Sequence, residues 1–587
     1  MSCKEEDLMK KFSLILIVLV VGLMVFAIGC DSTFNVGSNS GTTNTSSKST
    51  QTITGDDVQG STTDVEIEAD EITEEFTLVD ADGNKVEGVS GVYTITTAGS
   101  YTASGKITNG QIYVDVPGED VEIELNDVSI SNNYASPIFV KDCDTFTLKV
   151  KKNTTNYIYD VRSTDYSETT DETIGTAAIY VANGNLKING KGTISITSNK
   201  NSGIHGKDNV TIKNVTMMIK AMNNGIKGND KVTIEENPTI GIVCGNNGIK
   251  TSNSDMGSSA QHGYIYINGG TITINSYGDG IDAAYAVEFG TSEGDDGTVY
   301  TPTVDIYTNI YSSYTNTTSS SSTSNLSLAG PGGGGMMQGG GFNGGGFSGE
   351  TSAEKADESA KGVKANEYIL VSAGTIFTYT YDDGFHTNND KLDTGSTAKA
   401  NITITGGTLK IKASDDGIHA DGTLSIEGGV VYVSESHEGI EAKTINIKGG
   451  DVTVFGDDDG VNASSQINIT GGRLDVSVNP SGDTDGIDSN GSISISGGIV
   501  ITRGPNSEMA TPLDADGSIS ISGGTVICIG YFSSSIKYSG LTKSTLSSGK
   551  STGTYTVSVG GNTISYTNNY TYSGNVTVIG SGSASIA

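Results

Sequence analysis

The chain has 587 residues, of which 80 are glycine and 8 are proline, and its formal net charge is −34. Arginine occurs only at Arg162, Arg473 and Arg503, so the chain lacks the basic surface that nucleic acid requires. Cations, neutral polysaccharides, or anionic polymers bridged by cations remain as partners. Repeat folds grow in one dimension, so length says little here about the number of domains.

The N-terminus has the pattern of a bacterial lipoprotein signal. Lys10 and Lys11 precede an apolar run over 12–28 that is too short for a comfortable membrane span and ends just before Cys30. We expect residues 1–29 to be a signal peptide and Cys30 to be lipidated. This predicts a lipid-anchored protein on the outer face of the cytoplasmic membrane, at the cell surface of a bacterium of Gram-positive type.

Two features near this signal bear on processing and stability. Acidic residues precede Met9, so Met9 is an alternative start to Met1. Residues 30–63 are rich in Ser, Thr, Asn and Gly, which predicts a flexible linker.

The cysteines that remain after processing are odd in number and far apart, so we expect buried thiols and no disulfide framework: Cys143, Cys244 and Cys528.

Two short motifs recur along the second half of the chain. One ends in Gly-Gly, and the first glycines of these pairs stand at 406, 428, 449, 471, 497 and 523. The other has the form acid, Gly, branched apolar residue, as in Asp416-Gly417-Ile418. The strands between them alternate polar and apolar residues, and no segment has helical periodicity. A period of 21 to 26 residues with glycine corners predicts an all-β solenoid, a parallel β-helix, over residues 64–530.

The apolar residue of the second motif is an anchor that marks each predicted coil. Thirteen anchors can be read: Ile138, Ile179, Ile204, Ile226, Ile249, Ile281, Val363, Phe385, Ile418, Ile440, Val461, Ile487 and Leu513. Jumps in spacing predict loops at 156–176 and 251–263, and a Gly-rich insertion at about 290–361 that should be disordered. Residues 80–84 predict a hairpin turn rather than a calcium loop. Residues 531–587 predict a β-hairpin cap on the last coil.

Acidic residues gather at the predicted corners. We call the residue two before each anchor the corner column and the residue after each anchor the flanking column. From Asp279 onward, acids make up most of the corner column and half of the flanking column, and neighbouring coils would place like charges about 4.8 Å apart. Such a pair repels by about 0.9 kcal/mol in water and about 3.5 kcal/mol at an effective dielectric constant of 20. Calcium, which takes six to eight oxygen ligands, would relieve this repulsion.

The predicted calcium ligands are the carboxylates of these corners: Asp279, Asp282, Asp382, Asp383, Asp415, Asp416, Glu438, Glu441, Asp458, Asp459, Asp485 and Asp488. Simple turn residues are the alternative, because Asp-Gly is a common turn pair and Asn serves at Asn224 and Asn247. A transition metal is a third interpretation. It would use His386, His419 and His437, which lack tight ligand spacing and are interpreted as surface residues.

The lipoprotein signal, the Asp-Gly-Ile and Gly-Gly coils, the stretch Ala98–Val116 and the Gly-rich insertion together resemble a family of bacterial surface carbohydrate-binding proteins, best described in clostridia. The resemblance covers about residues 65–530. It implies a right-handed parallel β-helix similar to pectate lyases, bound calcium, and binding to cellulose-like and pectic polysaccharides such as polygalacturonate.

Three functions remain open. The first is polysaccharide binding by a monomer, with outward rows such as Ser492, Ser494 and Ser496, or with tyrosines such as Tyr264, Tyr266 and Tyr432, although each tyrosine also suits packing. The second is a calcium-dependent polysaccharide lyase acting by β-elimination, with a base among Lys227, Lys250 and Lys364. The third is an adhesin or spacer with a protein partner. No catalytic residue is singled out by the pattern.

Overall fold

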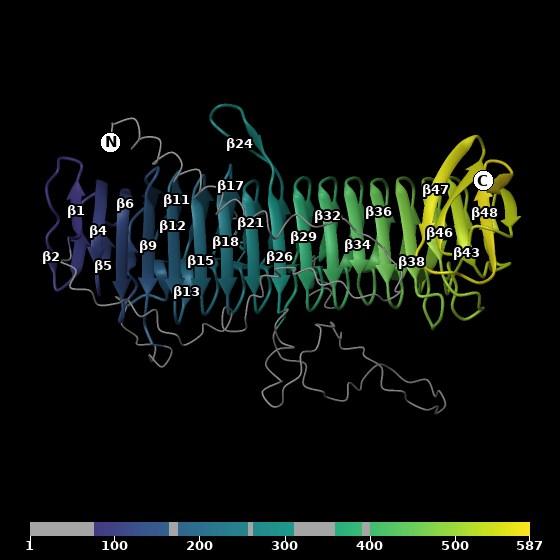
Figure 1. Ribbon diagram of the computed structural model, residues 1–587, viewed down its shortest axis with the longest axis horizontal. Coiled ribbons are helices and arrows are strands. Elements are labelled where there is room, and N and C mark those ends of the chain that lie inside the picture. Colours follow the sequence, from purple (N-terminus) through teal and green to yellow (C-terminus); the bar gives the residue numbers. More distant parts are fainter. Residues whose placement is uncertain (1–74, 164–173, 256–261, 310–358, 390–398, 587) are drawn as a thin grey trace, which may run out of the picture. The chain divides into compact units, whose positions relative to one another are not determined.

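The computed structural model describes residues 75–163, 174–255, 262–309, 359–389 and 399–586 (Figure 1). These residues belong to the compact unit Ile53–Ala587. Every regular element among them is a strand. Within these ranges, no helix has the length and hydropathy needed to cross a membrane. The predicted signal, the lipidated Cys30 and the linker lie outside the described residues.

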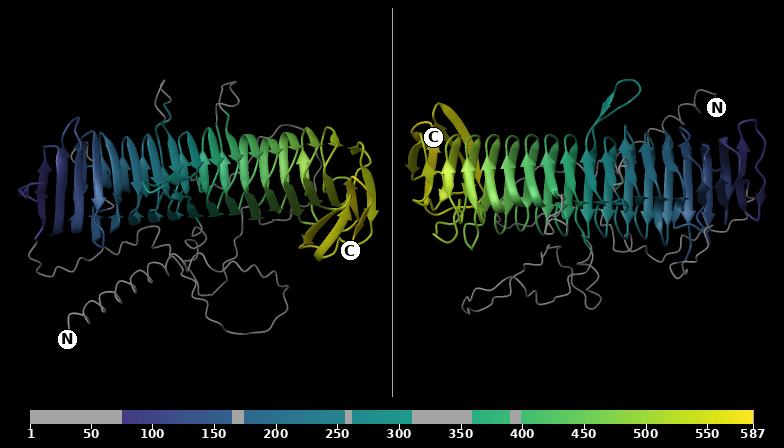
Figure 2. Two further views of the ribbon diagram at one scale, coloured as in Figure 1. Left: turned by 90° about the horizontal axis from the view of Figure 1, so that it is seen from above. Right: turned by 180° about the vertical axis from the view of Figure 1, so that it is seen from behind.

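Most strands stack in three parallel ladders, with one strand of each ladder in each coil (Figures 1 and 2). Ladder 1 carries the anchors and consists of β7 (Ile138–Asp142), β10 (Ala177–Val181), β13 (Ser202–Gly206), β16 (Ile226–Gly228), β19 (Ile249–Lys250), β22 (Ile281–Ala283), β27 (Val363–Ala365), β30 (Phe385–Thr387), the first halves of β33 (Ile418–Ile426), β35 (Ile440–Ile447) and β37 (Val461–Ile469), and β39 (Ile487–Ser489).

Ladder 2 consists of β8 (Thr145–Val150), β11 (Asn185–Gly190), β14 (Asn209–Lys213), β17 (Lys231–Glu235), β20 (Tyr264–Ile267), β23 (Ala286–Phe289), β28 (Tyr368–Val371), β31 (Asn401–Ile404), the second halves of β33, β35 and β37, β40 (Ser492–Ile495) and β42 (Ile519–Ile521). Ladder 3 consists of β9 (Thr155–Asp160), β12 (Thr193–Ser198), β15 (Thr216–Ala221), β18 (Thr239–Cys244), β21 (Thr271–Ser276), β26 (Thr303–Thr308), β29 (Thr375–Thr380), β32 (Thr408–Ala413), β34 (Val430–Glu435), β36 (Asp451–Gly456), β38 (Arg473–Val478), β41 (Ile499–Arg503) and β43 (Thr525–Gly530).

The core is a set of apolar side chains stacked in register inside the coils. In ladder 3, for example, Ile194 pairs with Met217, which pairs with Ile240 in the next strand, and all three are fully or almost fully buried. Burying such a side chain stabilises the fold by about 1.5–3 kcal/mol. The alternation that brings one residue in two to the interior is the pattern that predicted the fold, and the prediction of a parallel β-helix is confirmed.

The thirteen anchors lie side by side along ladder 1. The register pairs run from Ile138 with Ile179 to Val461 with Ile487, and an isolated bridge joins Ile487 to Leu513. Ile112 extends the same row one coil earlier by pairing with Ile138. Ile112 was not among the predicted anchors.

The glycine motifs mark two kinds of tight contact between coils. The second glycine of each Gly-Gly pair has a positive φ, for example +79° at Gly407 and +74° at Gly472, which favours glycine over other residues. In the acid–Gly corners, a Cβ atom at Gly417 would lie 2.5 Å from the carbonyl oxygen of Gly439 in the next coil. The coil spacing therefore requires glycine at both places.

Two predicted loops contain strands. β9 (Thr155–Asp160) overlaps the start of the predicted loop 156–176 and pairs with β12, so that loop is shorter than predicted. The predicted insertion at 290–361 contains the hairpin β24 (Ser292–Glu293) and β25 (Val299–Tyr300), and also β26, which belongs to ladder 3. These four strands were not predicted, because none of them follows a Gly-Gly pair. The prediction of disorder is wrong for residues 290–309, which contain these strands, and residues 310–358 of the insertion lie outside the described residues.

Antiparallel strands stand at both ends of the ladders. β1 (Thr77–Asp80) pairs with β4 (Gly99–Ile107), and β6 (Val121–Asn132) then continues from β4 toward β8 and β9. β2 (Gly88–Val89) pairs with β3 (Val92–Ile95), which lies beside β5 (Gln111–Asp115). A turn at 80–84 is closed by hydrogen bonds to Asp80, as predicted.

At the other end, β48 (Asn575–Gly580) pairs antiparallel with β43 and with β45 (Thr542–Leu546), while β44 (Lys537–Tyr538) follows β42. A small sheet of β46 (Gly553–Val559), β47 (Asn562–Asn568) and β49 (Ala584–Ile586) packs nearby. Cys143, Cys244 and Cys528 are buried free thiols, as predicted.

Candidate functional site

The corner column forms a chain of hydrogen bonds between coils. One side-chain oxygen of a corner residue accepts the backbone N–H of the corner residue in the next coil: Asn247 Oδ1 from Asp279 (3.0 Å), Asp279 Oδ1 from Lys361 (2.9 Å), Asp383 Oδ1 from Asp416 (3.1 Å), Asp459 Oδ1 from Asp485 (2.7 Å) and Asp485 Oδ1 from Thr511 (2.5 Å). Asn and Asp both supply this oxygen. This turn role explains one side-chain oxygen of Asp279, Asp383, Asp459 and Asp485, and the partner of the second oxygen remains to be identified.

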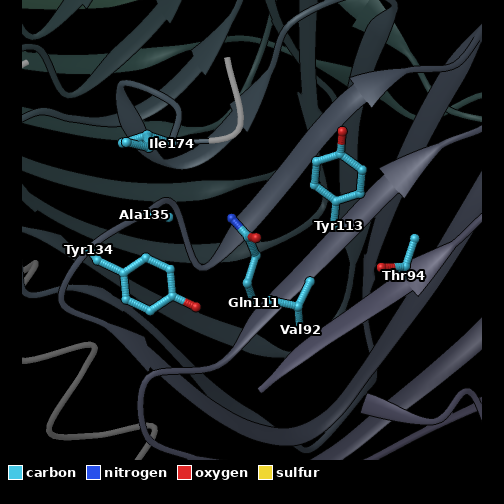
Figure 3. Close-up of a pocket in the computed structure, with 7 residues that line it drawn as sticks. All are labelled: Val92, Thr94, Gln111, Tyr113, Tyr134, Ala135 and Ile174. Atoms are coloured by element: carbon cyan, nitrogen blue, oxygen red, sulfur yellow. The ribbon is translucent and has the colours of Figure 1, made fainter. Parts of the chain in front are cut away.

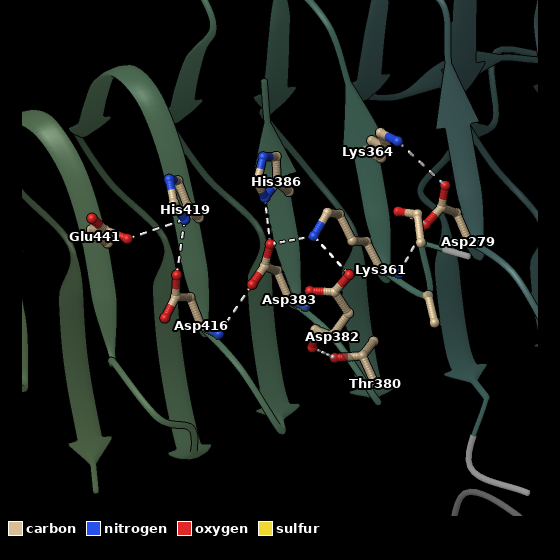
Figure 4. Close-up of polar contacts among 12 residues, drawn as sticks. Asp279, Lys361, Lys364, Thr380, Asp382, Asp383, His386, Asp416, His419 and Glu441 are labelled. Atoms are coloured by element: carbon tan, nitrogen blue, oxygen red, sulfur yellow. Dashed lines mark hydrogen bonds and ion pairs between the residues drawn. The ribbon is translucent and has the colours of Figure 1, made fainter. Parts of the chain in front are cut away.

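In the middle coils, lysine side chains form ion pairs with the second carboxylate oxygens of the corner aspartates. Lys361 Nζ lies 2.7 Å from Asp383 Oδ2 and 2.8 Å from Asp382 Oδ2 (Figure 4). Lys250 pairs with Asp282, and Lys364 Nζ lies 3.9 Å from Asp279 Oδ2. Burial alone would raise the pKa of Asp383, but the hydrogen bond to His386 and the charge of Lys361 hold it below its usual value. These carboxylates have charge partners within the chain.

Two histidines from the flanking column lie together in these coils. The rings of His386 and His419 stack with centroids 4.7 Å apart and an interplanar angle of 27°. His386 Nδ1 bonds Asp383 Oδ2, and His419 Nδ1 lies 2.8 Å from Asp416 Oδ2 and 3.1 Å from Glu441 Oε2 (Figure 4). The interpretation as a surface residue is wrong for His386, which is 7 % exposed, whereas His419 is half-buried.

The reason for that error is the separation of the two histidines in the sequence. They are 33 positions apart, although their strands β30 and β33 are hydrogen-bonded neighbours and His386 is in register with His419. Their shared place directly after the anchors Phe385 and Ile418 was the available signal. His437 is exposed, with Nε2 3.8 Å from Asp458 Oδ2, as the surface interpretation expected.

In the later coils, the described residues place no lysine or arginine beside the corner acids Glu438, Asp459 and Asp485. Burial and repulsion by Glu441 and Asp416 raise the pKa of Glu438 to about 8. Burial, with repulsion from Asp459, also raises the pKa of Asp485 to about 7, and burial raises that of Asp459 to about 6. The charged forms of these groups are therefore destabilised in the folded protein.

Four groups of potential ligand atoms within 4.8 Å of one another occur among the described residues. One lies in the later coils and consists of Asp485, Asp488 and Asp514. The others are Asp382 with Asp383 and Asp415, Asp383 with His386 and His419, and Asp416 with His419 and Glu441. The predicted set of acids is thus divided: the middle coils combine acids with Lys and His, while Asp485 and Asp488 belong to a group made of carboxylates alone.

A second surface of interest is the aromatic face, formed by outward side chains of five successive strands of ladder 3, β26, β29, β32, β34 and β36 (Figure 1). Its residues are Tyr307, Phe377, Tyr379, Lys410, Lys412, Tyr432 and Phe455. Tyr307 contacts Phe377 with centroids 5.7 Å apart, Lys412 Nζ lies 5.0 Å from the Tyr379 ring centre, and Tyr432 lies 6.3 Å from Phe455. These side chains are half-buried, except the exposed Lys410.

The other tyrosines singled out from the sequence lie on ladder 2. Tyr264 stacks on Tyr266 at 5.5 Å and is 7 % exposed, so it packs rather than presents a free ring face. Ser492 and Ser494 point outward from β40 as expected. Asparagine side chains also join coils, as at Asn468 and Asn446, 3.0 Å apart.

A cavity of about 420 Å³ opens near the N-terminal coils (Figure 3). Tyr113 and Tyr134 flank Gln111 in it, and the complete lining is Val92, Thr94, Gln111, Tyr113, Tyr134, Ala135 and Ile174. Tyr113 stacks on Phe139 at 5.4 Å, whereas Tyr134 is 39 % exposed. Because no lining residue is charged, the cavity suits a neutral group such as a sugar ring rather than an ion.

The three lysines considered as bases differ in their surroundings. Lys250 and Lys364 are paired with Asp282 and Asp279, as described above. Lys227 has no carboxylate within ion-pair distance among the described residues, and burial, with repulsion from Lys250 and Lys207, lowers its pKa. Lys227 is therefore the lysine best suited to accept a proton.

Comparison with known proteins gives three matches. The family model described as "Carbohydrate-binding domain-containing protein" matches residues 90–397 and 388–439, which is more than half of the chain. A curated protein of that description from Acetivibrio thermocellus is 29 % identical over 128 residues, covering 22 % of this chain and 44 % of the relative. A solved structure titled as a polysaccharide lyase-like protein from C. thermocellum, a gadolinium derivative, has 29 % identity and a TM-score of 0.33, covering 38 % of this chain and 87 % of that one.

Proposed function

The chain belongs to the family of carbohydrate-binding domain-containing proteins, and from this premise we propose that it is a cell-surface protein that binds polysaccharide along the aromatic face of ladder 3. The observation that carries the proposal is the set of aromatic rings on four of the five strands, β26, β29, β34 and β36, with Lys410 and Lys412 on β32 between them. Strands of one ladder are about 4.8 Å apart, so the rings follow one another along the solenoid axis. An extended glycan lying parallel to that axis would meet several rings in turn.

The chemistry of this face suits a sugar chain. Sugar rings present C–H groups that pack on aromatic faces, and hydroxyl groups that need hydrogen-bond partners. The rings of Tyr379 and Tyr432 offer the first, while their phenol groups and Lys410 offer the second. Lys412 Nζ is already paired with Glu435 Oε2 at 2.5 Å, so the exposed Lys410 is the cation that this face offers to a uronate-containing glycan, even though the net charge of the chain is −34.

We further propose that calcium binds between the clustered carboxylates of Asp485, Asp488 and Asp514 in the later coils. Asp485, Asp488 and Asp514 supply hard oxygen ligands without a competing cation among the described residues, which fits calcium chemistry. Asp459, Asp458 and Glu438 lie in the preceding coils as further oxygen donors. A bound calcium ion would also attract a uronate carboxylate. The N-terminal pattern supports attachment of the protein to the cell surface through Cys30.

A pull-down on insoluble cellulose and on immobilised polygalacturonate, each with calcium and with chelator, tests the proposal. We expect retention on at least one polymer, and loss of polygalacturonate retention in chelator. Failure to retain either polymer in calcium would contradict the proposal and favour an adhesin with a protein partner.

A calcium-dependent lyase is the second candidate, and Lys227 is the observation that favours it. Burial and the neighbouring lysines lower its pKa, so it is a better acceptor for the proton next to the uronate carboxyl group than an ordinary lysine. Asp282 follows two coils later in the flanking column, within the same ladder. Unsaturated products absorb ultraviolet light, so their appearance during incubation with polygalacturonate would identify this activity.

A further inference from the structure

The cavity near the N-terminal coils is built on two neighbouring strands, β3 and β5 (Figure 3). Their outward side chains pair in register, Val92 with Gln111 and Thr94 with Tyr113, and form the floor of the cavity. The corner before β7 and the corner before β10 supply its walls. Segments that are far apart in the sequence therefore meet around one space of about 420 Å³, a size typical of ligand pockets.

One wall is the turn that carries Tyr134, and a fully buried asparagine holds this turn in place. Asn132 Oδ1 accepts the backbone N–H groups of Tyr134 (2.9 Å) and Ala135 (2.8 Å). Asn132 Nδ2 donates to the carbonyl oxygen of Gly110 at 2.9 Å, which ties the turn to the start of β5. The Tyr134 ring is therefore presented at a fixed place beside the cavity, although it is 39 % exposed.

A second wall is Ile174, whose backbone is anchored by hydrogen bonds and a buried ion pair. The N–H of Ser136 donates to the carbonyl oxygen of Ile174 at 2.7 Å. Arg162 Nη1 donates to the carbonyl oxygen of the next residue, Gly175, at 2.8 Å. Arg162 also makes two hydrogen bonds to Asp160, at 2.7 and 2.6 Å, and both side chains are buried. Such a bidentate pair fixes the geometry, so the wall is formed before any ligand binds.

Two aromatic rings and one amide line the cavity. Tyr113 stacks on the fully buried Phe139 with centroids 5.4 Å apart and an interplanar angle of 12°, which fixes its ring. Gln111 stands between the rings of Tyr113 and Tyr134 (Figure 3). Its Nε2 donates to the carbonyl oxygen of Ser136 at 3.0 Å, which orients the amide. A sugar needs ring faces for its C–H groups and polar groups for its hydroxyls, and preformed contacts of both kinds lower the entropic cost of binding.

We propose that this cavity binds a neutral sugar unit of a glycan and is a second carbohydrate site of the chain. No described lining residue is charged, and Asp115 on β5 and Lys141 on β7 pair with each other at 2.9 Å. The cavity therefore offers no compensation for a uronate carboxylate, which is costly to remove from water. All seven lining residues lie within the stretch 90–397 that matches the carbohydrate-binding family.

This site differs from the aromatic face in the sugar that it takes and in its independence of calcium. The aromatic face lies on ladder 3 from β26 onward and includes the exposed Lys410. The lining of the cavity has neither a cation nor a carboxylate that could hold a calcium ion. The inference rests on the proposed function only in that the chain binds glycan, and the two sites are expected to bind independently.

Saturation-transfer NMR on the full-length protein tests the inference. The probes are cellobiose and xylobiose as neutral disaccharides, and digalacturonate as a charged one. We expect saturation transfer to at least one neutral disaccharide, unchanged in chelator, and at least tenfold weaker binding in Thr94→Tyr and in Tyr134→Ala. Thr94 is exposed, so a tyrosine there fills the cavity without disturbing the core. Tyr134→Phe keeps the ring and should keep most of the affinity.

Three variants serve as controls. Thr94→Ser leaves the cavity open. Tyr157→Ala removes a tyrosine that is 38 % exposed, almost the same as Tyr134, but lies on ladder 3. Tyr379→Ala removes a ring of the aromatic face. All three should bind the neutral disaccharide as the wild-type protein does, and thermal unfolding identifies any variant that fails to fold.

Three results would overturn the inference. The first is the absence of saturation transfer to both neutral disaccharides in the wild-type protein. The second is loss of binding in Tyr379→Ala with none in Thr94→Tyr, which would assign the disaccharide to the aromatic face. The third is digalacturonate binding that Thr94→Tyr abolishes, which would make the cavity a uronate site. Retention on cellulose or polygalacturonate is measured separately in the pull-down, so the two proposals fail separately.

Discussion

Asp459 and Asp485 are joined across neighbouring coils by a 2.7 Å hydrogen bond from the backbone N–H of Asp485 to Asp459 Oδ1. This contact uses only one carboxylate oxygen, and an asparagine side chain would supply the same acceptor. Asp459→Asn should therefore keep the stability of the calcium-free protein, or raise it by removing a repelled charge. Asp459→Ala should lose about 1–3 kcal/mol, because the N–H of Asp485 loses its acceptor.

Chemical denaturation in chelator measures both variants. If Asp459→Asn were as destabilised as Asp459→Ala, the hydrogen bond would not be the structural role of the corner column, and the charge itself would be required for folding.

Calcium should stabilise the protein by binding to the carboxylate cluster of Asp485, Asp488 and Asp514. At a free calcium concentration 100 times the Kd, one site contributes about 2.7 kcal/mol, seen as a rise in melting temperature. Asp485→Asn and Asp488→Asn should each remove most of this rise. Asp451→Asn is the control, because Asp451 is 60 % exposed on ladder 3. An equal calcium response in all three variants would place the ion elsewhere.

The raised pKa values predict an unusual pH dependence in chelator. Glu438 (about 8), Asp485 (about 7) and Asp459 (about 6) have folded-state pKa values above their unfolded values of 4.5 and 3.8. The folded protein therefore holds more protons, so their contribution to stability is complete below about pH 4 and is lost as the pH rises toward 8. Saturating calcium should remove much of this loss.

Melting temperatures between pH 4 and 8 check this, with the variant Asp485→Asn for comparison. His205 acts in the opposite direction, because burial lowers its pKa to about 4. The informative quantity is therefore the difference between wild type and variant. That difference should shift in favour of the variant as the pH rises, and a constant difference would contradict the raised pKa of Asp485.

The aromatic face should carry glycan affinity. Phe377→Ala and Tyr379→Ala should each weaken retention on the bound polysaccharide about tenfold, equivalent to about 1.4 kcal/mol, whereas Tyr379→Phe should keep most of the affinity because the ring remains. Tyr157→Ala is the control, because Tyr157 is an exposed tyrosine of the same ladder on β9, several coils away. Equal losses at Tyr157 and Tyr379 would remove the case for a localised platform.

Incubation with polygalacturonate and calcium separates binding from catalysis. As a binding protein, the chain should give no ultraviolet-absorbing product above the blank. An increase abolished by Lys227→Ala and kept by Lys187→Ala would instead establish the lyase. Lys187 is an outward lysine of ladder 2 on β11 and serves as the control.

Much of the fold was predictable from the sequence because each coil repeats the same two constraints. The coil spacing requires glycine at Gly417 and Gly472, and the interior requires an apolar residue at Ile418, so the period can be read directly. β9 and β26 were hidden because they bury alternate residues without either glycine motif.

The candidate site was only partly predictable. The corner column was recognised. Its division into middle coils, where lysine and histidine compensate the acids, and later coils with carboxylates alone was not, because charge compensation depends on residues from other coils. Lys361 illustrates this: it occupies the corner position of its own coil and neutralises Asp383 in the next one. The pairing of His386 with His419 likewise follows from the register of neighbouring coils, and residue spacing does not reveal it.

The chain leaves ladder 3 after Thr308 and resumes the corner column at Lys361, and Thr308 Oγ1 donates a hydrogen bond to the carbonyl oxygen of Ala360. The anchors before and after this excursion, Ile281 and Val363, pair in register. The two ends of this excursion are therefore held together by the scaffold itself. A foreign peptide or reporter domain grafted between them would be displayed from the middle of the solenoid at little cost in stability.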